Sequence, residues 1–126
     1  MLWAIPDNLS VNGIQTMKPT FQMKERHGAD IGQPVPYTAL MFTAGTVTHR
    51  LALHREATAL PDKYRQWSVS HPVIGAKVCR VDASYKGMPV SSAGLTLTQA
   101  RAAALATLEA LCERIGSDKF NAVVKP

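Results

Sequence analysis

The stretch that decides the fold is TLTQARAAALATLEALCERIG, residues 96–116, near the carboxyl end of the chain. Thr96 followed by Gln99 is a capping box, in which each side chain accepts a hydrogen bond from the backbone N–H group of the other residue. At the far end, Gly116 can take the left-handed conformation that commonly closes a helix. The two signals together predict a helix over residues 97–115.

Apolar residues along this stretch recur at the spacing of one helix face. They are Leu97, Ala104, Leu108, Leu111 and Ile115, with Leu105 and Cys112 widening the same stripe. The other face is rich in alanine, at Ala102, Ala103, Ala106 and Ala110. We expect the apolar face to pack on a core. The alanine face is either solvated or open to a second helix, including one from another subunit.

The region before this helix has the character of β-strands joined by turns. Two runs rich in β-branched and apolar residues, 38–43 and 46–54, are separated by Ala44 and Gly45 and predict a hairpin. Further strands are expected at residues 64–71, 76–81 and 88–91, with a turn over 82–87. The pattern indicates an α+β protein, an antiparallel meander of three to five strands covered on one face by the helix.

The first part of the chain gives weaker signals. Prolines and turn dipeptides predict an irregular N-terminal arm over residues 1–35, with Trp3 as its anchor on the core. Within this arm, residues 21–27 fit either one helical turn or a short strand. Residues 36–126 are expected to form a single α+β domain, since no linker or repeat divides them.

Composition limits the function classes without selecting one. The chain has 126 residues and a net charge of +5, which favours acidic partners such as nucleic acid but does not require them. Cys79 and Cys112 have neither zinc-site spacing nor the density of a disulfide scaffold, so we expect free thiols in a reducing compartment. No leader-like segment or run of membrane-spanning length is present, which predicts a cytoplasmic protein without a membrane partner.

No motif in the chain indicates catalysis. His49 and His54 are five residues apart on one predicted strand, so they face opposite sides and cannot easily share a metal. The acidic residues do not pair, and neither a nucleophile motif nor a glycine-rich phosphate loop is present. We therefore expect no cofactor, no metal and no catalytic residue. An enzyme that uses Cys79 or His71 stays as a weaker hypothesis.

Cationic and aromatic residues gather on the predicted strands, a combination that can follow a phosphate backbone and stack bases. The candidate nucleic-acid-binding residues are Arg50, Tyr64, Arg65, Trp67, Lys77 and Arg80, together with Lys86 before the helix and Arg101 within it. Structural explanations compete with this one. A strand tryptophan commonly belongs to the core, and a helical arginine can lay its stem along the core edge.

The last quarter of the chain resembles the second half of double-stranded RNA-binding domains. The matching residues are Gly94, Leu95, Thr96, Ala100 and Ala103–Leu105. The resemblance implies an α+β shape and a helix N-terminus that contacts phosphates through a lysine pair. Leu97, Thr98 and Gln99 lie at that place here, only Arg101 is basic, and the family's N-terminal helix is not evident.

Two function hypotheses follow from the sequence. The first is a small non-enzymatic binding protein that binds nucleic acid through a basic and aromatic sheet face. The alternative is a protein–protein interaction module, such as a small inhibitor or accessory factor, which can also form a homodimer through the alanine face of the helix. The loop over residues 85–89, beside the helix N-terminus, is a further candidate surface.

Overall fold

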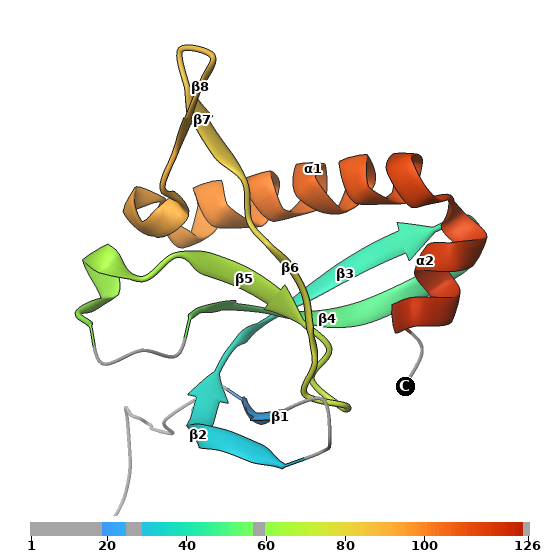
Figure 1. The fold of residues 1–126 in the computed structure, drawn as a ribbon, viewed down its shortest axis with the longest axis horizontal. Coiled ribbons are helices and arrows are strands. Elements are labelled where there is room, and N and C mark those ends of the chain that lie inside the picture. The colour runs from blue at the N-terminus through green and yellow to red at the C-terminus, as the bar shows by residue number, and fades with distance from the viewer. Residues whose placement is uncertain (1–18, 25–28, 57–59, 125–126) are drawn as a thin grey trace, which may run out of the picture.

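The structure, a computed structural model, describes residues 19–24, 29–56 and 60–124. An antiparallel sheet in the order β3-β4-β5-β6 forms its centre. Helices pack on one face of this sheet and a separate two-stranded hairpin lies on the other (Figure 1). The central strands are β3 (Thr38–Ala44), β4 (Val47–Arg55), β5 (Trp67–Ser70) and β6 (Lys77–Arg80). The predicted α+β class is confirmed.

Helix α1 spans Leu97–Ile115, as the capping signals predict. Both hydrogen bonds of the capping box are formed between Thr96 and Gln99. Gly116 has a φ of 90°, which an L-residue with a side chain rarely adopts, and its N–H group donates to the Cys112 carbonyl oxygen. The helix is therefore fixed at both ends by local sequence.

The main core lies between α1 and the sheet. Alternate residues of β3 and β4, such as Leu40 and Leu51, point at the buried helix residues Ala104 and Leu108. All four are at most 1% exposed. Each buried leucine contributes about 1.5–3 kcal/mol relative to exposure in water, so this face sets the register of the sheet.

A second helix, α2 (Ser117–Val124), follows Gly116 directly and was not predicted. Its Phe120 and Val124 complete the core beside Phe42. Asn121 donates to the Ala44 carbonyl oxygen at 3.1 Å and so ties α2 to the end of β3. The helix has only eight residues, two of them buried, and this is too short for a helical period to be recognised in the sequence.

Part of the arm that the sequence predicts to be irregular is a hairpin, which corrects that expectation. Strands β1 (Thr20–Lys24) and β2 (Asp30–Pro36) pair antiparallel, so the strand alternative is right for residues 21–24, while residues 25–27 lie outside the described ranges. Phe21 of this hairpin packs edge-on against His54 of the central sheet. Prolines normally argue against a strand, so they hide the strand pattern of β2. They are tolerated there because no further strand among the described residues pairs with its other edge. Trp3 lies outside the described residues.

Residues 82–90 also differ from the expectation. Strand β7 (Ala83–Tyr85) occupies part of the predicted turn, and it pairs with β8 (Met88–Val90) as a separate ribbon rather than as an edge of the central sheet. Lys86 and Gly87 have φ values of 52° and 80°, the left-handed pair of a type I′ hairpin turn. The ribbon projects past α1 (Figure 1).

The third strand is shorter than expected, because residues 62–64 form a 3-10 turn, η1 (Asp62–Tyr64). A second such turn, η2 (Ser92–Gly94), precedes α1. Arg55 joins the two, since its guanidinium donates to the carbonyl oxygens of Asp62 and Ala93, both at 2.8 Å. This arginine therefore holds the end of the sheet against the start of α1.

Candidate functional site

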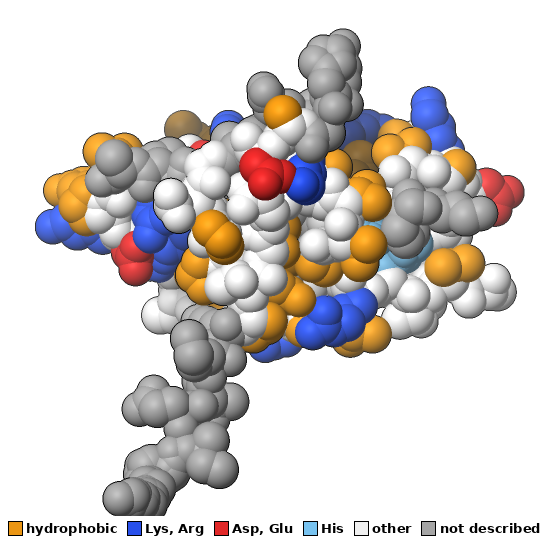
Figure 2. Space-filling model, turned by 90° about the horizontal axis from the view of Figure 1, so that it is seen from below, with side chains coloured by type: hydrophobic (Ala, Val, Ile, Leu, Met, Phe, Trp, Pro, Cys, Tyr) orange, Lys and Arg blue, Asp and Glu red, His pale blue; other side chains and the backbone are white. Residues whose placement is uncertain are grey.

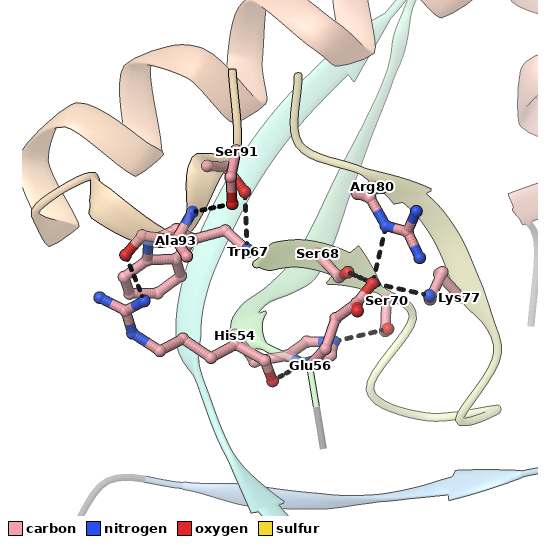
Figure 3. Close-up of polar contacts among 11 residues, drawn as sticks. His54, Glu56, Trp67, Ser68, Ser70, Lys77, Arg80, Ser91 and Ala93 are labelled. Carbon is pink, nitrogen blue, oxygen red and sulfur yellow. Dashed lines mark hydrogen bonds and ion pairs between the residues drawn. The ribbon is translucent and has the colours of Figure 1, made fainter. Parts of the chain in front are cut away.

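A carboxylate brings together two of the predicted nucleic-acid-binding cations. Glu56 Oε2 accepts from Arg80 Nε at 2.8 Å and from Lys77 Nζ at 3.2 Å, and the Ser68 hydroxyl adds a third bond at 3.2 Å (Figure 3). Burial alone would raise the pKa of Glu56, but the bonds from Arg80 and Lys77 outweigh it and lower that pKa. The cluster therefore keeps one net positive charge rather than two.

Beside this cluster, a histidine and a serine form a buried pair. His54 Nε2 lies 2.7 Å from Ser70 Oγ, and His54 Nδ1 lies 2.8 Å from the Arg55 carbonyl oxygen (Figure 3). A carbonyl oxygen only accepts, so Nδ1 carries the proton and Nε2 accepts from the hydroxyl group. The pair has the bonding of a nucleophile with its base. However, His54 is 2% exposed and Ser70 0%, so no substrate reaches the hydroxyl group.

Trp67 lies in the core and not on an open sheet face. Its side chain is 8% exposed, and its indole N–H group donates to the Leu95 carbonyl oxygen at 3.1 Å. The guanidinium carbon of Arg55 lies 4.4 Å from the centre of the indole ring. The competing structural explanation for this tryptophan is therefore the one that the packing supports, and Trp67 is not a platform for bases.

The other candidate cations are dispersed. Arg50 donates to the Tyr37 hydroxyl at 3.0 Å on the sheet, while Arg65 pairs with Asp62 at η1. Arg101 lies along the edge of β3, with its guanidinium 3.4 Å from the Ala39 carbonyl oxygen. Seen from the side of β1 and β2, lysine and arginine side chains form separate patches divided by other residues (Figure 2). On this face the lysine and arginine side chains thus do not form one continuous surface.

The β7–β8 ribbon presents a different kind of surface. Tyr85, Met88 and Val90 are exposed by 65%, 66% and 46%, and Lys86 lies between them at the turn with its Nζ 5.3 Å from the centre of the Tyr85 ring. These four residues are called the hairpin surface below. The loop hypothesis for residues 85–89 covers three of them, while Val90 was missed.

A shallow groove of about 440 Å³ runs beside the ribbon, between β7 and α1. The side of the groove formed by the helix is its floor, which contains Ala103, Ala106 and Ala110, and Leu95 also lines the groove. The alanine face of the predicted helix is therefore in part the floor of a groove. Small side chains let another backbone approach this floor closely.

The surroundings of Cys79 do not favour a reactive thiol. Burial raises the pKa of the Cys79 thiol to about 11, so the nucleophilic thiolate is scarce near neutral pH. Cys79 and Cys112 are both free and half-buried. Across residues 19–24, 29–56 and 60–124, no group of three histidine, cysteine or acidic side chains is placed to hold a metal ion. No helix in the same ranges is long and apolar enough to cross a membrane.

Comparisons with protein-family models, with curated proteins and with solved structures found no significant match to the chain. The order of strands followed by a helix, which belongs to the resemblance to double-stranded RNA-binding domains, is present in the structure. Fold and surfaces define the class, a small α+β protein with a projecting two-stranded ribbon beside a helix groove.

Proposed function

We propose that the protein is a protein–protein interaction module that associates with a second copy of itself through the hairpin surface. The observation that carries the proposal is the exposure of Tyr85, Met88 and Val90, each by 46% or more, on one projecting ribbon. Large apolar side chains scattered singly are ordinary, whereas apolar side chains gathered on one element favour a contact. Covering them removes apolar area from water, at about 25 cal/mol per Å².

The conformation of Lys86 supports a binding role for the ribbon tip. At a φ of 52°, it is the one residue other than glycine with positive φ in the described part of the chain. Type I′ turns favour Asn, Asp or Gly at this place, and a lysine there costs about 1 kcal/mol. A cation at a strained position supports contact with an acidic group of the partner.

The groove beside the ribbon supports a second copy as that partner. Each subunit carries both the hairpin surface and a groove floored by Ala106 and its neighbours. A two-fold arrangement would therefore let each ribbon cover the groove of the other subunit, an isologous contact. A reducing compartment such as the cytoplasm is part of this proposal, supported by the two free cysteines.

Analytical ultracentrifugation of the chain over a range of concentrations tests this association. We expect a monomer–dimer equilibrium, and we expect Ala106→Glu to shift it to monomer because a charge would then lie on the groove floor. Ala122→Glu, an exposed alanine on α2, is the matched control. A chain that stays monomeric at every concentration would rule out the second copy.

Nucleic acid is the second candidate partner, favoured by two lysine–tyrosine pairs. Lys63 lies 5.1 Å from the centre of the Tyr64 ring, as Lys86 lies beside Tyr85, and neither lysine has an ion pair with another described residue. Tyr64 is 60% exposed, so its face can meet a base. The net charge of +5 also favours binding to the negatively charged phosphate backbone.

A mobility-shift titration at two salt concentrations tests this second candidate. Glu56→Gln should tighten binding and steepen the salt dependence, because it removes the negative charge that balances Lys77 and Arg80. Lys63→Gln should weaken binding. A probe that does not shift at either salt concentration would reject nucleic acid as the partner. Binding that is independent of salt and of both substitutions would reject these residues as its site.

A further inference from the structure

A second hollow lies at the end of α1 that carries Leu111 and Ile115. The β7–β8 ribbon projects near the opposite end of this helix (Figure 1). The hollow measures about 240 Å³ and opens between α1, α2 and the loop that joins β5 to β6. Its walls are mostly apolar and include Val78, Leu111, Ile115 and Phe120. A pocket of this kind, with few polar groups among apolar walls, is the usual form of a small-molecule site.

One polar group at this pocket has a ring N–H group that bonds to no described residue and is not fully buried. His71 lines the pocket and is 6% exposed. Its Nδ1 accepts a hydrogen bond from the Val73 backbone N–H group at 3.2 Å. In the neutral ring the proton therefore lies on Nε2. No partner for Nε2 is present among the residues that the structure describes.

The loop that carries His71 is firmly held, which makes the donor a fixed one. The His71 N–H group donates to the Ala76 carbonyl oxygen, and the Gly75 N–H group donates to the His71 carbonyl oxygen, both at 2.8 Å. The backbone N–H group of Lys24 on β1 also donates to the Gly75 carbonyl oxygen, at 3.0 Å. A ring fixed in this way can select a ligand by the position of one acceptor.

We propose that this pocket binds a small apolar molecule about the size of one aromatic ring that carries a carbonyl oxygen, with His71 Nε2 as the donor to that oxygen. The size follows from the volume. A cavity of about 150 Å³ lined by apolar residues holds benzene, so a pocket of about 240 Å³ has room for a ring and a short substituent. This site is separate from the hairpin surface, and the inference does not depend on self-association.

Two probes of the same shape test the donor. Acetophenone has a ring and a carbonyl oxygen, whereas α-methylstyrene replaces that oxygen by a methylene group. We expect both to shift backbone amide NMR signals around the pocket. Acetophenone should bind about fivefold more tightly, the effect of one hydrogen bond of ordinary strength.

Two substitutions of His71 distinguish the hydrogen bond that Nε2 donates to the ligand from the one that Nδ1 accepts from Val73. In His71→Asn the amide oxygen can replace Nδ1 as acceptor for Val73, but the donor at Nε2 is lost. In His71→Gln the amide nitrogen lies near the place of Nε2 and restores a donor. The preference for acetophenone should therefore vanish in His71→Asn and persist in His71→Gln.

The proposal is overturned if neither probe shifts signals around the pocket, or if the native chain binds both equally. A preference that persists in His71→Asn would also overturn it. Should a variant fail to fold, the comparison of the two probes on the native chain decides alone. Ala76→Leu, at the exposed rim, should weaken both probes because it narrows the entrance.

Discussion

His54 Nε2 on β4 lies 2.7 Å from the hydroxyl oxygen of Ser70 on β5, with both side chains in the interior. The other ring nitrogen of His54 bonds to the Arg55 carbonyl oxygen, so both nitrogens of a buried ring are satisfied. Buried polar groups are tolerated when they are paired in this way. The histidine is therefore a structural element that attaches the sheet to the β1–β2 hairpin through its contact with Phe21.

Removal of the Ser70 hydroxyl group should destabilise the fold. In Ser70→Ala the Nε2 acceptor of His54 is left buried without a partner, and we expect a loss of about 1–3 kcal/mol in the free energy of unfolding. Urea unfolding measures it. Ser84→Ala, at an exposed position of β7, is the control and should stay within about 0.5 kcal/mol of the native chain. Equal stability of the two variants would contradict a structural role.

The same burial predicts how stability depends on pH. Burial is the main cause that lowers the pKa of His54, and the charge of Lys77 lowers it further. Burial is also the main cause that lowers the pKa of His71, and the charge of His49 lowers it further. Near pH 6.5 the unfolded chain takes up protons that the native state does not, so it is favoured as pH falls. The contribution of the two neutral histidines to the free energy of unfolding is therefore complete above about pH 6.5 and decreases below it.

Urea unfolding at a series of pH values checks this sign. The free energy of unfolding should fall between about pH 6.5 and 5, before the lowered pKa of Glu56 begins to matter below its ordinary value of 4.5. His54→Gln should show a shallower fall. A stability that is flat or rises as pH drops through this window would show that these histidines are not buried as neutral rings.

Gly75 should be the least replaceable of the glycines that the structure describes. At its φ of 75°, a Cβ atom would overlap the Gln22 carbonyl oxygen and the Lys24 side chain. We expect Gly75→Ala to cost about 2–5 kcal/mol, the sum of the left-handed conformation and the steric overlap. Gly32→Ala is the control, since Gly32 has a similar φ of 64° but open space around it, and should cost only about 1–2 kcal/mol. Equal losses in chemical unfolding would mean that β1 does not pack on this loop.

Substitution of Lys86 should separate stability from binding. Lys86→Asn gives the Asn-Gly pair that type I′ turns prefer, so we expect it to raise the free energy of unfolding by up to about 1 kcal/mol. The same change removes the cation at the ribbon tip and should weaken association. Thermal unfolding and ultracentrifugation give the two readouts. A variant that is more stable and associates as well as the native chain would show that Lys86 has no binding role.

The parts of this structure that can be predicted from the sequence are those that depend on local patterns. The capping box at Thr96 and the glycine at 116 act within one helix turn, and α1 begins and ends where they predict. The β3–β4 hairpin and the opposite orientations of His49 and His54 follow from the period of two in a strand. His49 accordingly packs against Phe120 and His54 against Phe21, on opposite faces.

The remaining features depend on contacts between distant segments. The pairing of Glu56 with Lys77 and Arg80 requires the register of three strands, and no local motif indicates it. Trp67 is covered by Arg55 and by the turn that carries Leu95, which a strand pattern does not reveal. The sequence therefore predicts the sheet, but it cannot tell which cations of that sheet are already paired.

The measurement that tests the central claim most directly compares two methionine substitutions in the analytical ultracentrifuge. Met88 of the hairpin surface is 66% exposed, and Met41 on β3, away from the ribbon, is 57% exposed. Met88→Glu and Met41→Glu thus change the same chemistry at two places. We expect Met41→Glu to associate like the native chain, and Met88→Glu to weaken association about 30-fold, the effect of one important contact residue. Equal association of the two variants, or a native chain without any dimer, would contradict the account.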